Sequence, residues 1–310
     1  MSNILIIKHG SLGDLIQANG AISDIKAHYK SSKIFLLTTR PYIDLMSHCP
    51  YVDGVLIDKR LPRWNILYLY KLKKLLNKFN FSHVYDLQNS SRTKFYKRFL
   101  LKSQNWSSSE TTLKSGEKKK DFDVAPVLDR MKEQLNKSGI TTNRIKNIDL
   151  SWAFLDLRRL IRQYSNNKYI LVFPFCSKKH DNKKWPYFKK LINKLKENYK
   201  NKYSVLIIPG PGEIDESRNL NAKVVLNDGN ILNIQMLITL INSAEFVISN
   251  DTGPAHIASH LNKKGLVLFG SHTSAKKVSI TNINFKSLDV KDLKNLKVDR
   301  VLEKINNILN

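Results

Sequence analysis

Short apolar runs typical of β-strands alternate with helical patterns along this sequence, and the alternation occurs twice. In the first half, strand-like runs lie at residues 4–8, 33–39, 52–58 and 83–88. In the second half, further runs lie at residues 169–175, 204–210, 245–250 and 265–270. Strands that alternate with helices form parallel sheets covered by helices on both faces. The sequence therefore predicts an α/β chain with two doubly wound domains in tandem.

The chain is long enough for two domains, because 310 residues correspond to about 150 residues in each. Residues 141–167 show little periodicity, so we expect an N-terminal domain at 1–160 and a second domain at 161–297. The stretch 103–121 is polar and Ser-rich, which predicts a long mobile loop. Doubly wound sheets bind ligands outside the carboxyl ends of their strands, so we expect the two domains to face each other across a central cleft.

The net charge of +26 favours an anionic partner. Nucleic acid, an anionic membrane surface and an anionic substrate all fit such a charge. The lysines are spread along a chain that is also rich in Asn and Ile, so genomic composition bias is an alternative explanation. No apolar run approaches about 18 residues, and we find no signal-peptide pattern. Cys49 and Cys176 are the only cysteines, which indicates a reducing compartment and hence a cytoplasmic protein.

The segment DTGP at 251–254 follows an apolar run and precedes a helical pattern. A helix N-terminus presents free N–H groups and a partial positive charge, so this segment can bind phosphate. Asp251 would repel phosphate, and we expect it to accept hydrogen bonds from sugar hydroxyls instead. The alternatives are a plain capped turn and, for His256 one turn further on, a histidine satisfied within the core. His256 and His260 lack the intervening Glu of a zinc-protease helix, so we expect no metal there.

The segment GSLGD at 10–14 places two glycines and a carboxylate in a strand-to-helix turn. It is not the GxGxxG of dinucleotide-binding proteins, and no acidic residue is clearly placed for a ribose, which disfavours a nicotinamide-dependent oxidoreductase. Asp14 lies at the start of the helix, where the helix dipole favours its ionised form. An ionised carboxylate there can act as a general base, and a simple helix-start aspartate is the alternative.

Five segments together resemble glycosyltransferase family nine, the lipopolysaccharide heptosyltransferases. They are GSLGDLIQANGAI (10–22), YDLQNSSRT (85–93), KKWPYFKKLI (183–192), PGPGEIDES (209–217) and SNDTGPAHIASHL (249–261). The resemblance covers nearly the whole chain in the family's order. It implies the GT-B fold, with two Rossmann-like domains, and inverting transfer of a sugar from a nucleotide diphosphate, usually ADP-heptose. The implied acceptor is a sugar on a lipid A core or a similar surface glycan.

The resemblance also implies roles for particular residues. The general base falls on Asp14. The donor contacts fall on Ser177, Lys183, Glu213, Leu232, Asp251, Thr252, Gly253 and His256. Lys184 and Glu216 are alternatives to Lys183 and Glu213, because each lies close to the family's position. The acceptor side is implied at Ser11, Gly13, Arg60, Arg63 and Arg92, where the alternative for the basic residues around Trp64 is a solvated loop.

No metal and no cofactor besides the nucleotide-sugar substrate are expected. A cation such as Lys183 and the helix start after Asp251 can stabilise a diphosphate leaving group without a metal. The sequence DFD at 121–123 spells the DxD metal motif of a different glycosyltransferase fold, and we interpret it as accidental. The amphipathic segment 298–310 is expected to pack back on the N-terminal domain, as GT-B chains do.

The expected partners are a nucleotide-sugar, an anionic lipid-linked glycan acceptor and an anionic membrane surface, with no nucleic acid. The protein is therefore expected to be peripheral on the inner face of the cytoplasmic membrane. The family usually continues with Pro-Thr-Asp-Pro after the run at 265–270, whereas this chain has SHTS at 271–274. A different nucleotide-sugar donor therefore stays open. A basic nucleic-acid-binding module is the alternative from another class, although the dispersed lysines disfavour it.

Overall fold

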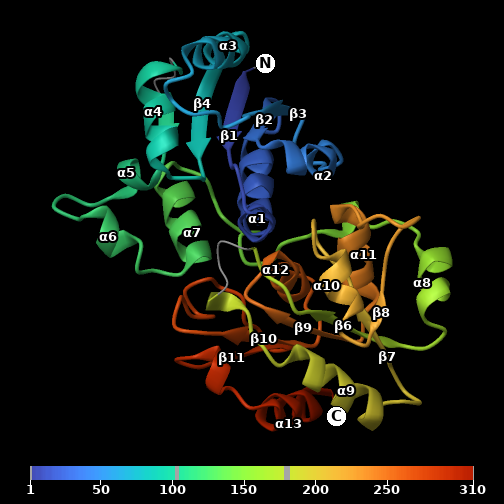
Figure 1. The fold of residues 1–310 in the computed structure, drawn as a ribbon. Helices are drawn as coiled ribbons and strands as arrows, with labels where there is room; N and C mark the ends of the chain where they lie inside the picture. Colours follow the sequence, from blue (N-terminus) through green and yellow to red (C-terminus); the bar gives the residue numbers. More distant parts are fainter. Residues whose placement is uncertain (1, 102–104, 178–181, 310) are drawn as a thin grey trace. The chain divides into compact units, whose positions relative to one another are not determined.

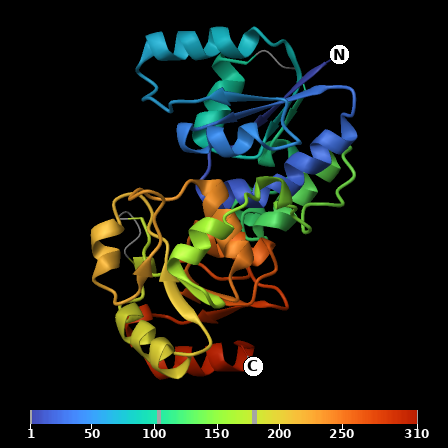
Figure 2. The same cartoon turned by 90° about the vertical axis from the view of Figure 1, so that its right-hand side faces the viewer.

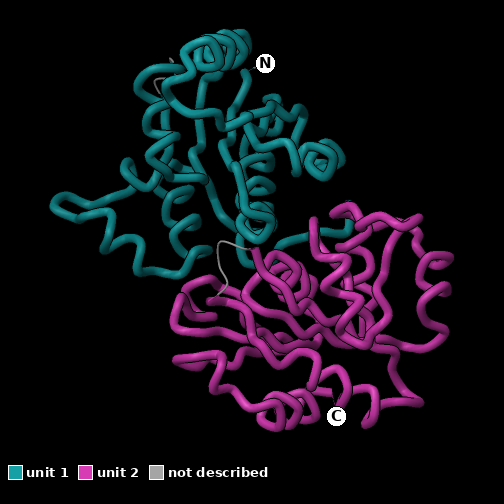
Figure 3. The backbone as a smooth tube through the Cα atoms, in the orientation of Figure 1, with its two compact units in different colours: residues 1–152 teal, residues 153–310 magenta. Residues whose placement is uncertain are grey.

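The computed structural model describes residues 2–101, 105–177 and 182–309, and the chain forms two compact units (Figure 3). Unit 1 comprises residues 1–152 and unit 2 residues 153–310. The division lies within the predicted connection, just before the boundary expected at residue 160. That the two domains face each other across a cleft stays a prediction.

Unit 1 contains a parallel five-stranded sheet in the order β3-β2-β1-β4-β5 (Figure 1). Its strands are β1 (Asn3–Ile7), β2 (Lys33–Thr38), β3 (Gly54–Ile57), β4 (Phe81–Asp86) and β5 (Asn105–Ser107). Its helices are α1 (Leu12–His28), α2 (Ile43–Ser47), α3 (Ile66–Asn77), α4 (Ser91–Phe99), α5 (Ser109–Thr112), α6 (Lys119–Phe122) and α7 (Val127–Lys137).

Unit 2 contains a parallel six-stranded sheet in the order β11-β10-β9-β6-β7-β8. Its strands are β6 (Tyr169–Phe173), β7 (Ser204–Ile207), β8 (Lys223–Val224), β9 (Phe246–Asn250), β10 (Gly265–Phe269) and β11 (Phe285–Asp289). Its helices are α8 (Arg158–Tyr164), α9 (Phe188–Asn198), α10 (Ile214–Arg218), α11 (Ile234–Ser243), α12 (Gly253–His260) and α13 (Val298–Leu309). Helices cover both faces of each sheet (Figure 2), which confirms the predicted α/β class.

The central strands are rich in apolar residues because both of their faces are covered. Every residue of β6 and β9 is buried, and so are Ile4–Ile7 of β1. These strands place the functional loops, since the loops at their carboxyl ends begin from a rigid, fully buried frame. No helix among the described residues is long and apolar enough to cross a bilayer.

The C-terminal helix corrects one expectation. We expected 298–310 to pack on the N-terminal domain, but α13 packs against α9 and β10 in unit 2. Its apolar stripe, Val301, Ile305 and Leu309, is buried in the same core as Leu195 of α9. The spacing of four residues aligns the three side chains on one helix face, and the groove beside α9 accepts that face.

The stretch 103–121 is more structured than expected. Residues 103 and 104 lie outside the described residues, but the next three form β5, which extends the sheet beside β4. Trp106 is buried in the unit 1 core, and Ser108 caps α5 by accepting a hydrogen bond from the Thr111 N–H. Serine suits loops and helix caps equally well, so the composition alone misled the prediction.

Candidate active site

The strand order reverses beside β1 and β4 in unit 1 and beside β6 and β9 in unit 2. Such switch points leave a crevice outside the carboxyl ends of the strands, where doubly wound sheets bind ligands. The predicted motifs follow these four strands: GSLGD follows β1, YDLQ ends β4, the Lys183 loop follows β6 and DTGP follows β9. The sequence motifs and the topology therefore select the same two sites.

In unit 2, Asp251 lies directly after β9 and is surrounded by basic side chains. Its Oδ2 is 2.6 Å from Lys183 Nζ and 3.1 Å from His272 Nε2. Its Oδ1 is 3.7 Å from His256 Nε2. The structure thus brings together three predicted donor residues and adds His272, which the sequence analysis noted only as a departure from the family pattern.

Asp251 is ionised despite its burial. Burial alone raises the pKa of this carboxyl, but the nearby His256 and the hydrogen bond and charge of Lys183 outweigh burial and hold the pKa well below its usual value. The negative charge that would repel a phosphate is therefore balanced within the site. A lysine ammonium has three N–H donors, so Lys183 can bind Asp251 and an anionic ligand at the same time.

The start of α12 is open rather than capped by a side chain. Thr252 is the N-cap residue with an extended backbone, and its hydroxyl lies 3.0 Å from Ser249 Oγ instead of capping the first turn. Gly253 and Pro254 follow as the first helical residues. This geometry disfavours the plain capped turn and leaves the dipole of α12 available to an anion.

Asn250 fixes the loop that carries Lys183, and the sequence analysis did not single it out. Its Oδ1 accepts a hydrogen bond from the Trp185 N–H at 3.1 Å, and its Nδ2 donates to the Pro174 carbonyl at 2.9 Å. The Trp185 indole in turn donates to the Leu296 carbonyl at 2.9 Å from within the core. An amide with no solvent exposure at the end of a buried strand is the signal that identifies such a residue.

We expect Asn250→Ala to destabilise the protein by about 1–3 kcal/mol, because it leaves a buried donor and a buried acceptor unpaired. Thermal or urea unfolding checks this value. The matched control is Asn230→Ala, which truncates an exposed asparagine and should change stability by no more than about 0.5 kcal/mol. Equal effects of the two substitutions would show that the amide bonds of Asn250 do not hold the loop.

The structure distinguishes Lys183 from its neighbour. Lys184 forms an ion pair with Glu216, and its ammonium lies 5.3 Å from the centre of the Phe175 ring. Lys183 alone of the two contacts Asp251. The choice of Lys183 over Lys184 is therefore consistent with the geometry around the DTGP segment.

The other predicted donor residues lie in three different loops of unit 2. The half-buried Glu213 accepts a hydrogen bond from the Gly210 N–H at 2.7 Å, while burial raises its pKa. Leu232 is half-buried just before α11, and Ser177 is exposed after β6. No contact joins these three residues to Asp251 among those the described residues show, so their roles stay predictions.

In unit 1, the segment after β1 holds Asp14 at the start of α1. Asp14 Oδ2 accepts hydrogen bonds from the Ser11 N–H at 3.0 Å and the Ser11 hydroxyl at 3.1 Å. Gly10 has φ +90°, and a Cβ there would lie 2.4 Å from the Tyr42 ring, so only glycine fits this turn. Asp14 is half-buried and keeps an oxygen outside these bonds, as a general base requires.

A buried lysine, Lys8, ends β1 below this turn. Its ammonium donates to the Leu87 carbonyl at 3.0 Å, which joins the ends of β1 and β4. Burial lowers the pKa of Lys8, while the charges of Asp14 and Asp86 oppose that shift. Lys8 and Asp14 therefore interact electrostatically at this end of the sheet.

Two of the three predicted acceptor arginines are used to build unit 1. Arg92 donates to the carbonyls of Arg60 at 3.1 Å and Leu61 at 2.7 Å, and so holds the loop after β3. Arg63 donates to Ser91 Oγ at 2.8 Å. The Arg60 side chain is exposed, and its charge and that of Asp14 act in opposite directions on the pKa of Tyr42, which burial raises most. Of the three arginines, Arg60 is thus the one whose charge acts on the same tyrosine as the charge of Asp14.

A buried carboxylate that the sequence analysis missed, Asp58, supports the same loop. It lies 2.9 Å from His9 Nε2, accepts a hydrogen bond from the Tyr96 hydroxyl at 2.6 Å and is also bonded by Tyr68. Burial raises the pKa of Asp58, but these three partners outweigh burial and hold it below its usual value. Asp58 further accepts from the Arg60 N–H at 2.7 Å, which fixes the backbone of Arg60.

The DxD sequence is engaged in an ordinary ion pair. Asp123 accepts from Arg130 at 2.8 Å, near the start of α7. Within the ranges that the structure describes, no three His, Cys, Asp or Glu side chains come together as a metal-binding group.

Two units in tandem, each with a doubly wound parallel sheet, make up the GT-B fold. Residues 69–305 match the sequence profile of Glycosyltransferase family 9 (heptosyltransferase), and the chain belongs to this family. The recognition made from the motifs is therefore confirmed.

Similar proteins support the same assignment. Lipopolysaccharide heptosyltransferase 1 of Campylobacter coli is 26% identical and is matched over 91% of this chain and 87% of its own length. The E. coli heptosyltransferase WaaC, solved with ADP, is 15% identical with a TM-score of 0.74 over 99% of both chains. E. coli ADP-heptose heptosyltransferase II is 18% identical with a TM-score of 0.74 over 100% of this chain and 98% of its own. The two solved structures show a shared fold.

Proposed function

We propose that this protein transfers a heptose from ADP-heptose to a sugar of a lipopolysaccharide core or a similar surface glycan, with inversion at the anomeric carbon. The contact of Lys183 with Asp251 at the start of α12 carries the proposal, because a cation next to a helix N-terminus is an arrangement that attracts a diphosphate. The WaaC structures with ADP and with ADP-2-deoxy-2-fluoro heptose support the choice of donor.

The donor half of the reaction follows from the electrostatics around Asp251. The bond between the anomeric carbon and the diphosphate oxygen breaks, and its electron pair stays on the diphosphate. Lys183 and the first-turn amides of α12 stabilise that growing charge. Asp251, paired with Lys183 and in contact with His256 and His272, accepts hydrogen bonds from hydroxyls of the donor.

The acceptor half requires a base. The acceptor hydroxyl attacks the anomeric carbon, a new C–O bond forms, and the proton passes to Asp14. The two hydrogen bonds from Ser11 orient the Asp14 carboxylate without removing its capacity to accept a proton. A single displacement of this kind inverts the anomeric centre. The exposed Arg60 is suited to an anionic acceptor.

A different nucleotide-sugar is the second candidate donor, and the position of His272 beside Asp251 is the observation that favours it. His272 stands in the departure from the family pattern and contacts Asp251 at 3.1 Å. A side chain in contact with that carboxylate can change which hydroxyls of the donor sugar are accepted.

The proposed location of the protein is the inner face of the cytoplasmic membrane, where a lipid-linked anionic acceptor would be presented.

A thermal-shift panel with ADP, UDP, GDP and CDP tests the donor. A ligand at about 100 times its Kd stabilises a protein by about 2.7 kcal/mol, which such an assay detects. We expect stabilisation with ADP and a much smaller effect with the other three nucleotides. A larger effect of UDP, GDP or CDP would keep the fold and replace the donor, whereas no effect of any nucleotide would contradict the proposed function.

A further inference from the structure

We propose that the loop before α3 and the first turns of that helix form a membrane-docking surface for anionic lipid. We call this surface the α3 crest, and it consists of Trp64, Ile66, Leu67 and Tyr70. The proposal deepens the proposed function by assigning its membrane partner to particular residues. It rests on the proposed function only in that a lipid-linked acceptor lies at such a membrane.

The α3 crest is an exposed apolar patch that the fold of unit 1 does not use. Trp64 is 79% exposed, Ile66 and Leu67 are each 76% exposed and Tyr70 is 64% exposed. Large apolar side chains this exposed and this close together mark an interaction site more often than scattered single residues do.

The helical period shows that the crest points away from the core. Leu72 and Leu76 of α3 are buried and face the sheet. At 100° per residue, Leu67 and Tyr70 lie on the opposite side of the helix, and Ile66 lies on the adjoining flank. A surface helix normally carries polar residues on its outer side. The first turns of α3 are different, because their outer side is apolar and nothing in the unit covers it. Figure 1 shows α3 at the outer rim of its unit.

The charge around the crest is complementary to an anionic surface. Residues 59–78, which form the loop before α3 and the helix itself, carry seven Lys and Arg residues and no acidic residue. This segment therefore has a net charge of +7 next to the exposed apolar side chains. Lysines near an anionic leaflet add attraction residue by residue.

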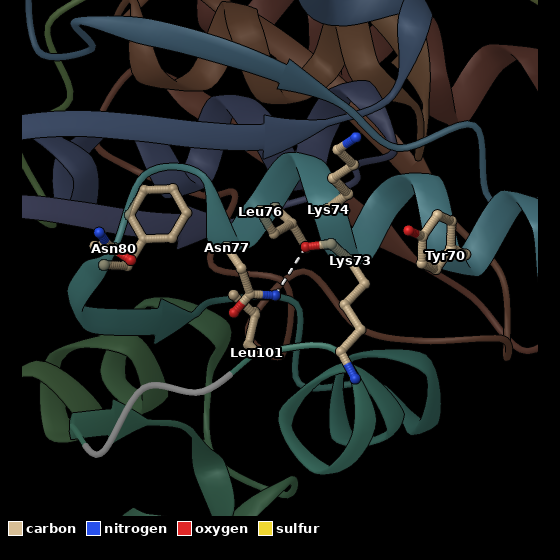
Figure 4. Close-up of a pocket in the computed structure, with 8 residues that line it drawn as sticks. Tyr70, Lys73, Lys74, Leu76, Asn77, Asn80 and Leu101 are labelled. Atoms are coloured by element: carbon tan, nitrogen blue, oxygen red, sulfur yellow. Dashed lines mark hydrogen bonds between the residues drawn. The ribbon is translucent and has the colours of Figure 1, made fainter.

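The lysines of α3 frame the crest from both sides. Lys73 and Lys74 line a hollow beside the helix together with Tyr70 and Asn77, and in Figure 4 their ammonium groups point to opposite sides of α3. Asn77 Nδ2 donates to the Lys73 carbonyl at 2.8 Å and to the Leu100 carbonyl at 2.6 Å, which fixes this end of the helix. A helix with apolar and aromatic residues on one surface and lysines at its flanks is typical of segments that lie in a bilayer interface.

The side chains favour lipid over nucleic acid. Aromatic side chains can stack on bases, but the aliphatic Ile66 and Leu67 gain more from the acyl region of a bilayer than from the hydrated, charged surface of a polynucleotide. Trp64 and Tyr70 are the residue types enriched at membrane interfaces. The partner that these side chains favour is therefore a bilayer surface with anionic headgroups.

Sedimentation with lipid vesicles tests the proposal on the full chain. One set of vesicles is phosphatidylcholine alone, and the other is phosphatidylcholine mixed with phosphatidylglycerol. We expect the protein to sediment with the anionic vesicles and not with the neutral ones. The variant with Trp64→Ser, Ile66→Ser and Leu67→Ser should lower the partition coefficient by at least about tenfold, because it removes the inserting surface.

The control variant carries Val124→Ser and Ile283→Ser, which replace apolar residues that are 74% and 80% exposed outside the crest. It should partition as the unchanged protein does. Equal binding of the crest variant and the control, or equal binding to neutral and anionic vesicles, would overturn the proposal. If the crest variant lost binding to a DNA duplex but still bound the anionic vesicles, the crest would be assigned to nucleic acid instead. ADP binding by the crest variant, measured in parallel, should be unchanged, so a failure of the donor assignment is distinguished from a failure of the membrane surface.

Discussion

Replacing Asp14 with Asn is expected to lower kcat by about 10²- to 10⁴-fold, because the acceptor hydroxyl then has no base to take its proton. The amide oxygen of Asn can still accept the bond from the Ser11 N–H, so the start of α1 should fold as before. The donor KM should change little, since Asp14 lies in unit 1 and the predicted donor contacts lie in unit 2. Steady-state release of the nucleoside diphosphate measures both parameters.

The matched control is Asp44→Asn, which alters an exposed aspartate in the first turn of α2. Both substitutions remove a negative charge from a helix start, at a cost of about 0.3–1 kcal/mol in stability. Only the change at Asp14 should affect turnover. If the two variants had the same kcat as the unchanged protein and similar losses of stability, Asp14 would be a simple helix-start aspartate and the mechanism would be wrong.

The second large effect is expected at Lys183. We expect Lys183→Ala to lower kcat/KM by about 10²- to 10³-fold, the range found when one preorganised donor to a developing charge is removed. The loss has two causes. The diphosphate loses a cation, and the buried carboxylate of Asp251 loses the partner that lies 2.6 Å away, so its charge then repels the leaving group. Initial rates over a range of donor concentrations measure the effect.

Lys184→Ala provides the control, because Lys184 is the next residue and is paired with Glu216 on the protein surface. Surface pairs of this kind contribute little, so kcat/KM should stay within a factor of about three. A larger loss at Lys184 than at Lys183 would show that the family's lysine has been placed one residue too early. No loss at either position would show that no lysine of this loop contacts the diphosphate.

The sequence predicted the fold well where strands are buried on both faces. β1, β6 and β9 are rich in apolar residues, so their positions could be recognised without a structure. β8 has two residues, and β11 has three polar residues among its five, so neither differs enough from a loop to be recognised. The amphipathic stripe of α13 predicted a helix correctly, but a stripe does not identify the surface it packs on.

In the candidate site, too, local sequence patterns predicted some residues, whereas others depend on the tertiary fold. Asp251 and Asp14 were selected because each belongs to a short motif next to a recognisable strand, and Lys183 was selected because the family resemblance implied it. The ion pair of Lys183 with Asp251 joins residues that are 68 positions apart in the sequence. The contact of His272 with Asp251 depends on the path of the loop after β10, which brings His272 next to the end of β9. Asn250 and Asp58 act through partners that only the tertiary fold brings within hydrogen-bond distance. Local patterns contain no information on those distances.

The most direct test of the central claim is transfer from ADP-heptose to a heptose-free lipopolysaccharide core on lipid A. Mass spectrometry detects the added sugar, and nuclear magnetic resonance of the product determines the anomeric configuration of the new bond. We expect one heptosyl residue on the acceptor, an inverted anomeric centre and one ADP released for each transfer. Transfer with retention, or transfer only from a donor with another nucleotide, would contradict the assignment of an ADP-heptose-dependent inverting transferase.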